Sequence, residues 1–183
     1  MKPYKILSPC AILGYGFPEE SFILGIKEKP DAIVVDAGST DAGPHKLGLG
    51  IGIVSRQAYK KDLQHILKAG AQLKIPVIIG SCGGSGGKPH LSWTKEIVDE
   101  IMAEEHLHSK IALIHAVISK ETVSSKLEAG EVEPLGISVK PLTPKRLEAT
   151  TEIVAQMGHE PIIKALEGGA DIILCGRAYD PAP

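Results

Sequence analysis

The chain has 183 residues, a length that suits one domain of ordinary size. Its hydrophobic share of 43% and charged share of 23% are typical of globular proteins, which excludes a disordered chain. The formal net charge of -2, with Lys and Glu spread evenly, lacks the concentrated basic face that nucleic acids require. No apolar run reaches the roughly 18 residues that span a bilayer, and no signal peptide is visible, so we expect a cytoplasmic protein without a membrane partner.

Unbroken apolar runs, rich in Ile and Val, alternate along the chain with segments of helical spacing. The predicted strands are residues 5–13, 32–36, 76–80, 110–118 and 171–175, and the predicted helices are 19–29, 55–68, 93–105 and 161–167. Ser55 and Ser92 are the expected N-caps of the second and third helices. This alternation predicts a single α/β domain over residues 1–183, with a mainly parallel, doubly wound sheet. Part of a (β/α)8 barrel stays open as an alternative, because the sequence does not give the strand order.

The last predicted strand is followed by only a few residues and by no helix that would cover it. A parallel strand left in this way would expose apolar surface, so we expect the chain to be the N-terminal part of a longer enzyme or to need a partner subunit. A homo-oligomer stays open as well.

The loop after the second predicted strand combines two carboxylates with two hydroxyls. Asp36 and Asp41 are candidate catalytic residues, as general base, and Ser39 and Thr40 are candidate substrate-binding residues. The same two carboxylates offer the oxygen ligands that a divalent cation prefers, so a metal ion is a further alternative. The plainer interpretation is a turn, because Asp, Ser, Thr and Gly are ordinary turn formers.

The third predicted strand leads through a glycine-rich loop into a helix, which is the arrangement of an anion cradle. Its candidate substrate-binding residues are Ser81, Gly83, Gly84 and Ser85. The loop matches neither the P-loop pattern nor the dinucleotide fingerprint, so no nicotinamide or flavin cofactor is predicted.

Two further residues follow predicted strands. His115 interrupts an apolar run and is a candidate acid or base, or else a hydrogen-bonded core histidine. Arg177 could clamp a carboxylate or phosphate through two parallel hydrogen bonds, or else pair with Asp180 to hold its own loop.

Four blocks in a fixed order carry a resemblance to a known family. They are DAGSTDAGPHKLG (36–48), IPVIIGSCGGSGG (75–87), VAQMGHEPIIKAL (154–166) and GGADIILCGRAYD (168–180). In this combination the chain resembles the N-terminal part of the acyclic terpene utilisation family. The resemblance implies a catabolic enzyme, or a component of one, linked to the breakdown of acyclic terpenes and related branched acids or their CoA thioesters.

Two functional hypotheses follow. The first is an enzyme, a lyase or hydratase, acting on a small carboxylate or acyl-CoA thioester, in which Asp36 or Asp41 moves a proton and Arg177 holds negative charge. The second is a noncatalytic ligand-binding or assembly subunit.

Overall fold

The structure is a computed structural model, and it describes residues 3–38 and 43–183. The strands are β1 (Ile6–Leu7), β2 (Ala32–Asp36), β3 (Val77–Gly80), β4 (Ile111–Ile114) and β5 (Ile172–Cys175). The helices are α1 (Glu19–Lys27), α2 (Gly43–Leu49), α3 (Arg56–Leu73), the short 3-10 helix η1 (Cys82–Gly84), α4 (Lys88–Glu104), α5 (Lys120–Glu128), α6 (Pro144–Ala149) and α7 (Glu160–Glu167).

Over the described residues, the sheet contains five parallel strands in the order β1-β2-β3-β5-β4. The α/β prediction is therefore confirmed. The barrel alternative is wrong, because successive strands of a (β/α)8 barrel are neighbours, whereas here β5 lies between β3 and β4. The register pairs Asp36 with Gly80, Ile79 with Leu174, and Ile114 with Cys175, so the strands end almost level. The loops that follow these strands consequently emerge at one edge of the sheet.

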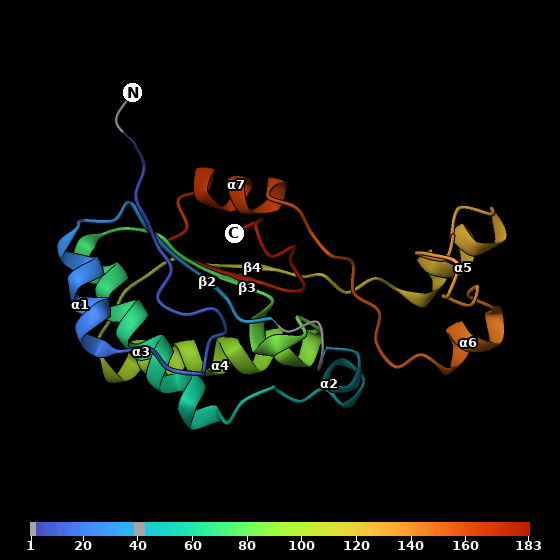
Figure 1. Cartoon of the computed structure of the whole chain (residues 1–183), viewed down its shortest axis with the longest axis horizontal. Coiled ribbons are helices and arrows are strands. Elements are labelled where there is room, and N and C mark those ends of the chain that lie inside the picture. Colours follow the sequence, from blue (N-terminus) through green and yellow to red (C-terminus); the bar gives the residue numbers. More distant parts are fainter. Residues whose placement is uncertain (1–2, 39–42) are drawn as a thin grey trace.

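Helices cover both faces of the sheet (Figure 1). On one face α1, α3 and α4 enclose the larger core, in which Ile33, Val35 and Ile79 of the sheet meet the inner sides of α3 and α4. On the other face, Ile162 of α7 packs against a smaller cluster around Ile173. Successive residues of β5 alternate between the two cores, as the pleat of a strand requires. The unbroken apolar runs of the sequence follow from this double coverage.

The expectation that the last strand would be uncovered is wrong. All four residues of β5 are buried, because β5 lies between β3 and β4 rather than at an edge of the sheet. Both α4 and α7 contact this strand. The apolar surface of β5 is therefore satisfied within the chain itself.

The predicted helix boundaries hold best where capping is strong. The Ser55 hydroxyl accepts a hydrogen bond from the backbone N–H of Ala58 at 3.2 Å, which confirms this N-cap. The helix α4 begins earlier than predicted, after Gly87, because Pro89 occupies its first turn instead of ending the preceding loop. The predicted cap at Ser92 is thus wrong.

An arm that the sequence did not predict as such leaves the body after β4 (Figure 1). The chain departs through Val117 and returns through Val154, which form an antiparallel bridge. Between them α5 and α6 contact each other, and no residue of α5 is buried. Leu135 and Ile137, in the segment that joins the two helices, are almost completely exposed at 99% and 110%. Since the backbone leaves the sheet after Ile114, the predicted strand 110–118 is too long.

No helix in the described part of the chain has the length and apolar character needed to cross a membrane.

Candidate functional site

The site lies at the edge of the sheet where β2, β3 and β5 end. A Cβ atom added to Gly38 would stand 3.0 Å from Oδ1 of Asp36, 3.0 Å from Nη1 of Arg177 and 2.8 Å from Cβ of Ser81. Three candidate residues, each at or just after the end of a different strand, therefore surround one glycine. Gly38 has no side chain, which leaves room for the guanidinium group.

Ser81 connects the ends of β3 and β5. Its hydroxyl donates to the carbonyl of Ala178 and accepts from the N–H of the same residue, both at 3.2 Å. The side chain is fully buried, and the backbone has the left-handed φ of 46°, which is uncommon outside glycine. The described contacts thus engage the Ser81 hydroxyl in fixing the loop after β5.

The glycine-rich loop is buried throughout, and its amides are used within the protein. The N–H of Gly83 donates to the Tyr59 hydroxyl at 3.0 Å. The next two amides stay within the loop: Gly84 N–H donates to the Ser81 carbonyl at 3.0 Å. Ser85 N–H donates to the carbonyl of Cys82. Burial is the main cause that raises the pKa of the Tyr59 phenol, so this residue is a neutral anchor for the loop. The loop shapes the site from beneath.

Gly86 brings the loop against the backbone that follows β5. Its carbonyl accepts from the N–H of Arg177 at 3.1 Å, and its φ of 67° lies in the left-handed region. On the opposite side of this segment, Met157 donates to the carbonyl of Arg177 at 3.0 Å and accepts from Tyr179 at 3.0 Å. The chain around Arg177 is therefore held from two sides.

The charged groups at this edge are incompletely paired. Only 12% of the Arg177 side chain is exposed, and among the described residues its one ion pair is a long contact of 3.8 Å to Asp180, itself 64% exposed. Asp36 is half-buried, and its Oδ1 accepts from the N–H of Gly38 at 2.9 Å. Burial raises the pKa of Asp36, while the Gly38 hydrogen bond and the nearby Arg177 charge oppose that rise. A carboxyl that holds its proton more tightly thus lies near a shielded cation.

The other predicted residues are placed differently. His115 follows the edge strand β4 and is exposed, although its neighbour Ala116 contacts Gly176. Ser39, Thr40 and Asp41 lie outside the described residues, so their roles stay predictions. Within the described residues, no group of three or more His, Cys, Asp or Glu side chains could hold a metal ion.

Sequence reasoning missed His90 and Glu152 at the start of α4. His90 is 1% exposed, and its Nε2 lies 3.0 Å from the carbonyl oxygen of Ile51. Glu152 belongs to the returning leg of the arm and accepts the N–H of Lys88 at 3.2 Å. The residue types gave no signal, because the two lie far apart in sequence and meet only through the arm.

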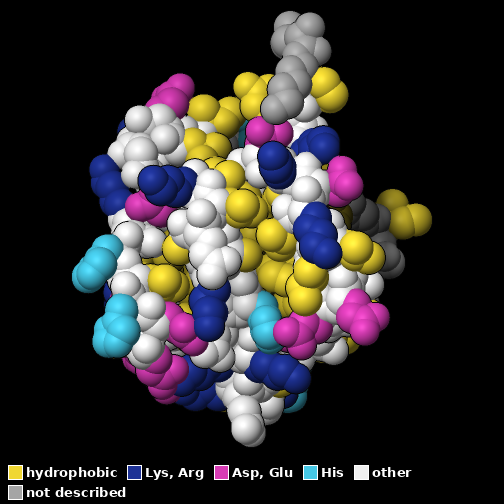
Figure 2. Space-filling model, turned by 90° about the vertical axis from the view of Figure 1, so that its left-hand side faces the viewer, with side chains coloured by type: hydrophobic (Ala, Val, Ile, Leu, Met, Phe, Trp, Pro, Cys, Tyr) yellow, Lys and Arg dark blue, Asp and Glu magenta, His cyan; other side chains and the backbone are white. Residues whose placement is uncertain are grey.

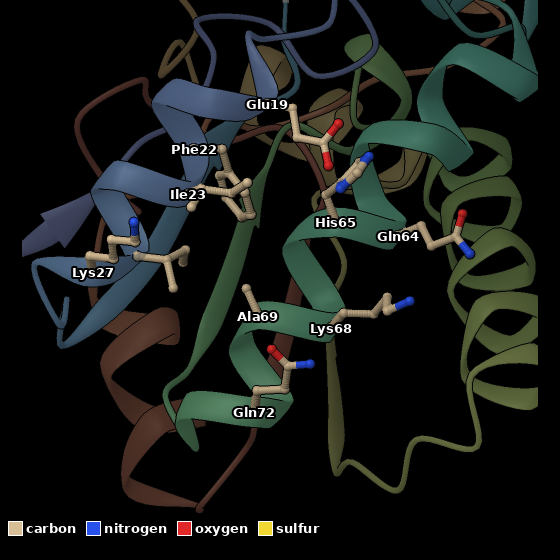
Figure 3. Close-up of a pocket in the computed structure, with 10 residues that line it drawn as sticks. Glu19, Phe22, Ile23, Lys27, Gln64, His65, Lys68, Ala69 and Gln72 are labelled. Atoms are coloured by element: carbon tan, nitrogen blue, oxygen red, sulfur yellow. The ribbon is translucent and has the colours of Figure 1, made fainter.

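A separate groove runs between α1 and α3 and has a volume of about 500 Å³ (Figure 3). Phe22 and Ala69 are its buried apolar residues, and the face seen from the α1 side carries many hydrophobic side chains interspersed with Lys and Arg (Figure 2). Lys68 and Gln64 turn away from α1 and bind Glu105. The groove therefore has an apolar middle and lies apart from the strand-end site.

The fold and this edge define an open α/β protein whose strand-end loops gather a half-buried carboxyl and a shielded guanidinium. The family model for the acyclic terpene utilisation family protein AtuA matches residues 55–183, and the chain belongs to this family. Ser81, His115 and Arg177 lie within the match, whereas Asp36 precedes it. No curated protein and no solved structure matches the chain.

A pair of glycine substitutions tests the packing of the site. A Cβ on Gly86 would stand 2.1 Å from the backbone nitrogen of Arg177, whereas a Cβ on Gly130, also at positive φ, would meet nothing within 4 Å. We expect Gly130→Ala to cost about 1 kcal/mol of unfolding free energy, the price of the left-handed backbone alone. Gly86→Ala adds a backbone clash and should cost more than about 3 kcal/mol. Urea denaturation of both variants checks this, and equal losses would contradict the observed packing.

The protonation of Asp36 gives a second prediction. Because its pKa is raised in the folded protein, the ionised carboxylate destabilises the fold above that pKa, and this cost disappears as the pH falls through it. Asp36→Asn keeps an oxygen for the Gly38 N–H and removes the charge. We expect the variant to be at least as stable as the parent at pH 7, with the difference shrinking toward pH 4. Denaturation across this pH range measures it, and a clear loss of stability at pH 7 would show that the charge is stabilising.

Proposed function

We propose that the strand-end site binds a small carboxylate or an acyl-CoA thioester and acts on it as a lyase or hydratase. Membership of the acyclic terpene utilisation family implies involvement in that process. The observation that supports a carboxylate or thioester ligand is the environment of the Arg177 guanidinium. This group is shielded from water, yet it lacks a close carboxylate among the described residues. Shielding a cation is costly unless it is paired, so a ligand anion would complete its environment.

The chemistry of the two groups suits reactions that build negative charge beside a carbonyl. The planar fork of Arg177 matches a carboxylate or a developing enolate, and it would stabilise such charge most where water is excluded. Asp36 would move the proton, since a carboxyl with a raised pKa works closer to neutral pH than an ordinary one. In a lyase it would take the proton from carbon, and in a hydratase from water.

A ligand-binding or assembly subunit is a second candidate, and the arm favours it. Leu135 and Ile137 expose large apolar side chains at a point that nothing in the described body of the protein covers. In this case the protein would associate with another copy or another subunit through the arm. Sedimentation analysis of the parent and of Ile137→Asp distinguishes the two situations, because only an assembly subunit would dissociate in the variant.

The catalytic proposal is tested with short dicarboxylates and branched acyl-CoA thioesters. A ligand that binds the native state raises the melting temperature, and mass spectrometry detects the gain or loss of one water molecule on turnover. We expect Arg177→Ala to abolish the thermal shift, and Asp36→Asn to keep the shift but lose turnover by at least about 100-fold.

Lys164→Ala is the matched control, since Lys164 is an exposed cation of α7 on the other face of the sheet. It should behave like the parent in both assays. If Arg177→Ala binds and turns over these compounds as the parent does, the site has been placed wrongly.

A further inference from the structure

The first turn of α4 has an unusual cap. Its N-cap is Gly87, and no side chain of the helix itself caps the exposed amides. A carboxylate from elsewhere takes that role, because Glu152 of the arm accepts the N–H of Lys88 at 3.2 Å. The N-terminus of a 17-residue helix carries partial positive charge and favours an anion. An internal carboxylate thus occupies the position where a bound anion would lie.

His90 supplies an independent observation at the same place. Its Nε2 faces the carbonyl oxygen of Ile51, which can only accept, so Nε2 carries a proton, and in the neutral ring Nδ1 then carries a lone pair. Among the described residues Nδ1 is buried and has no hydrogen-bond partner. A Cβ on Gly87 would stand 3.1 Å from this Nδ1 and 3.5 Å from the carboxyl carbon of Glu152. The unpaired nitrogen and the carboxylate therefore flank the same point of the helix start.

This arrangement leaves hydrogen-bonding capacity unused. A buried polar atom without a partner destabilises the state in which it is left unpaired. Glu152 is tethered to the base of the arm, and no hydrogen bond joins it to His90 among the described contacts. A mobile carboxylate would not have this restriction. Its two oxygens could serve the Lys88 amide and the imidazole together.

We propose that the start of α4 is a second anion site, for a ligand carboxylate that displaces Glu152. One ligand oxygen accepts the N–H of Lys88. The other accepts from Nδ1–H of His90, which takes up one proton from solvent as the ligand binds. Displacing Glu152 removes one of the contacts between the arm and the start of α4, so occupancy of this site is coupled to the arm's position. This goes beyond the function proposed for Asp36 and Arg177 and does not depend on it.

The surrounding charges set the pH dependence. Glu152 from the arm and Lys88 from α4 flank the helix start, while Arg56 shares a neighbouring cavity with His90 and is paired with Glu100 at 2.5 Å. Because binding takes up a proton at His90, affinity for a carboxylate should rise as the pH falls from 8 to 6. An ordinary carboxyl ligand stays ionised throughout this range.

Calorimetric titration with succinate tests the proposal, with Arg177→Ala protein as the parent for every variant so that the strand-end site does not bind the same probe. Glu152→Ala removes the internal competitor and should bind at least about tenfold more tightly than the parent at pH 6. The difference in succinate affinity between this variant and the parent should be smaller at pH 8. The double variant Glu152→Ala/His90→Gln should lose it, because the glutamine amide can still donate to Ile51 but offers no group at the Nδ1 position. Glu148→Ala, a neighbouring arm glutamate, is the control and should bind like the parent.

If the alanine variant folds poorly, Glu152→Gln replaces it in the titration, because its amide oxygen can keep the Lys88 hydrogen bond while the charge is lost. We expect this variant to gain less affinity for succinate, with the same dependence on pH. The proposal is overturned if neither Glu152 variant gains affinity, if the gain is independent of pH, or if it survives in the His90 variant. Because every protein in this titration lacks the Arg177 guanidinium, the result does not depend on the strand-end site, and failure here is distinguishable from failure there.

Discussion

The contact between the glycine-rich loop and the segment after β5 is the constraint on which the rest of the site depends. Gly86 accepts the N–H of Arg177, and the Ser81 hydroxyl makes two hydrogen bonds to Ala178. These bonds continue the pairing of β3 with β5 beyond the last residues of the two strands. The direction in which Arg177 leaves the backbone is thereby fixed before any ligand is present, and a site held in this way needs little rearrangement to bind.

The same loop separates two chemically different regions. On one side the guanidinium of Arg177 approaches Gly38 and Asp36, and on the other His90 and Glu152 meet at the start of α4. The loop's own amides at Gly83 and Gly84 donate within the protein, so the loop contributes to the site through close packing and not through free N–H groups at these two residues. Glycine is needed at Gly86 because a side chain would strike the Arg177 backbone. In both proposals the groups that would bind an anion at this edge are side chains and the start of α4.

The sequence was sufficient to predict the alternation of strands and helices, because apolar runs covered on both faces leave a clear pattern. It also pointed to Arg177 and Asp36, since residues that follow parallel strands share one edge. It could not show that β5 inserts between β3 and β4, because strand order depends on which connection crosses over. His90 and Glu152 were missed for a related reason: they meet only after the 119–152 arm returns to the body, and no local pattern encodes that return.

We infer that the glycine-rich loop and the segment after β5 form one rigid unit, and native-state amide hydrogen exchange measures this directly. We predict that the N–H groups of Gly83, Arg177 and Ala178 exchange as slowly as those of β3, because each is hydrogen-bonded within the protein and Gly83 and Ala178 are buried. Gly130, which follows the C-cap of α5 on the arm, provides the fast reference. Exchange of Arg177 and Ala178 at the rate of Gly130 would mean that this contact does not hold the site, which contradicts a rigid unit.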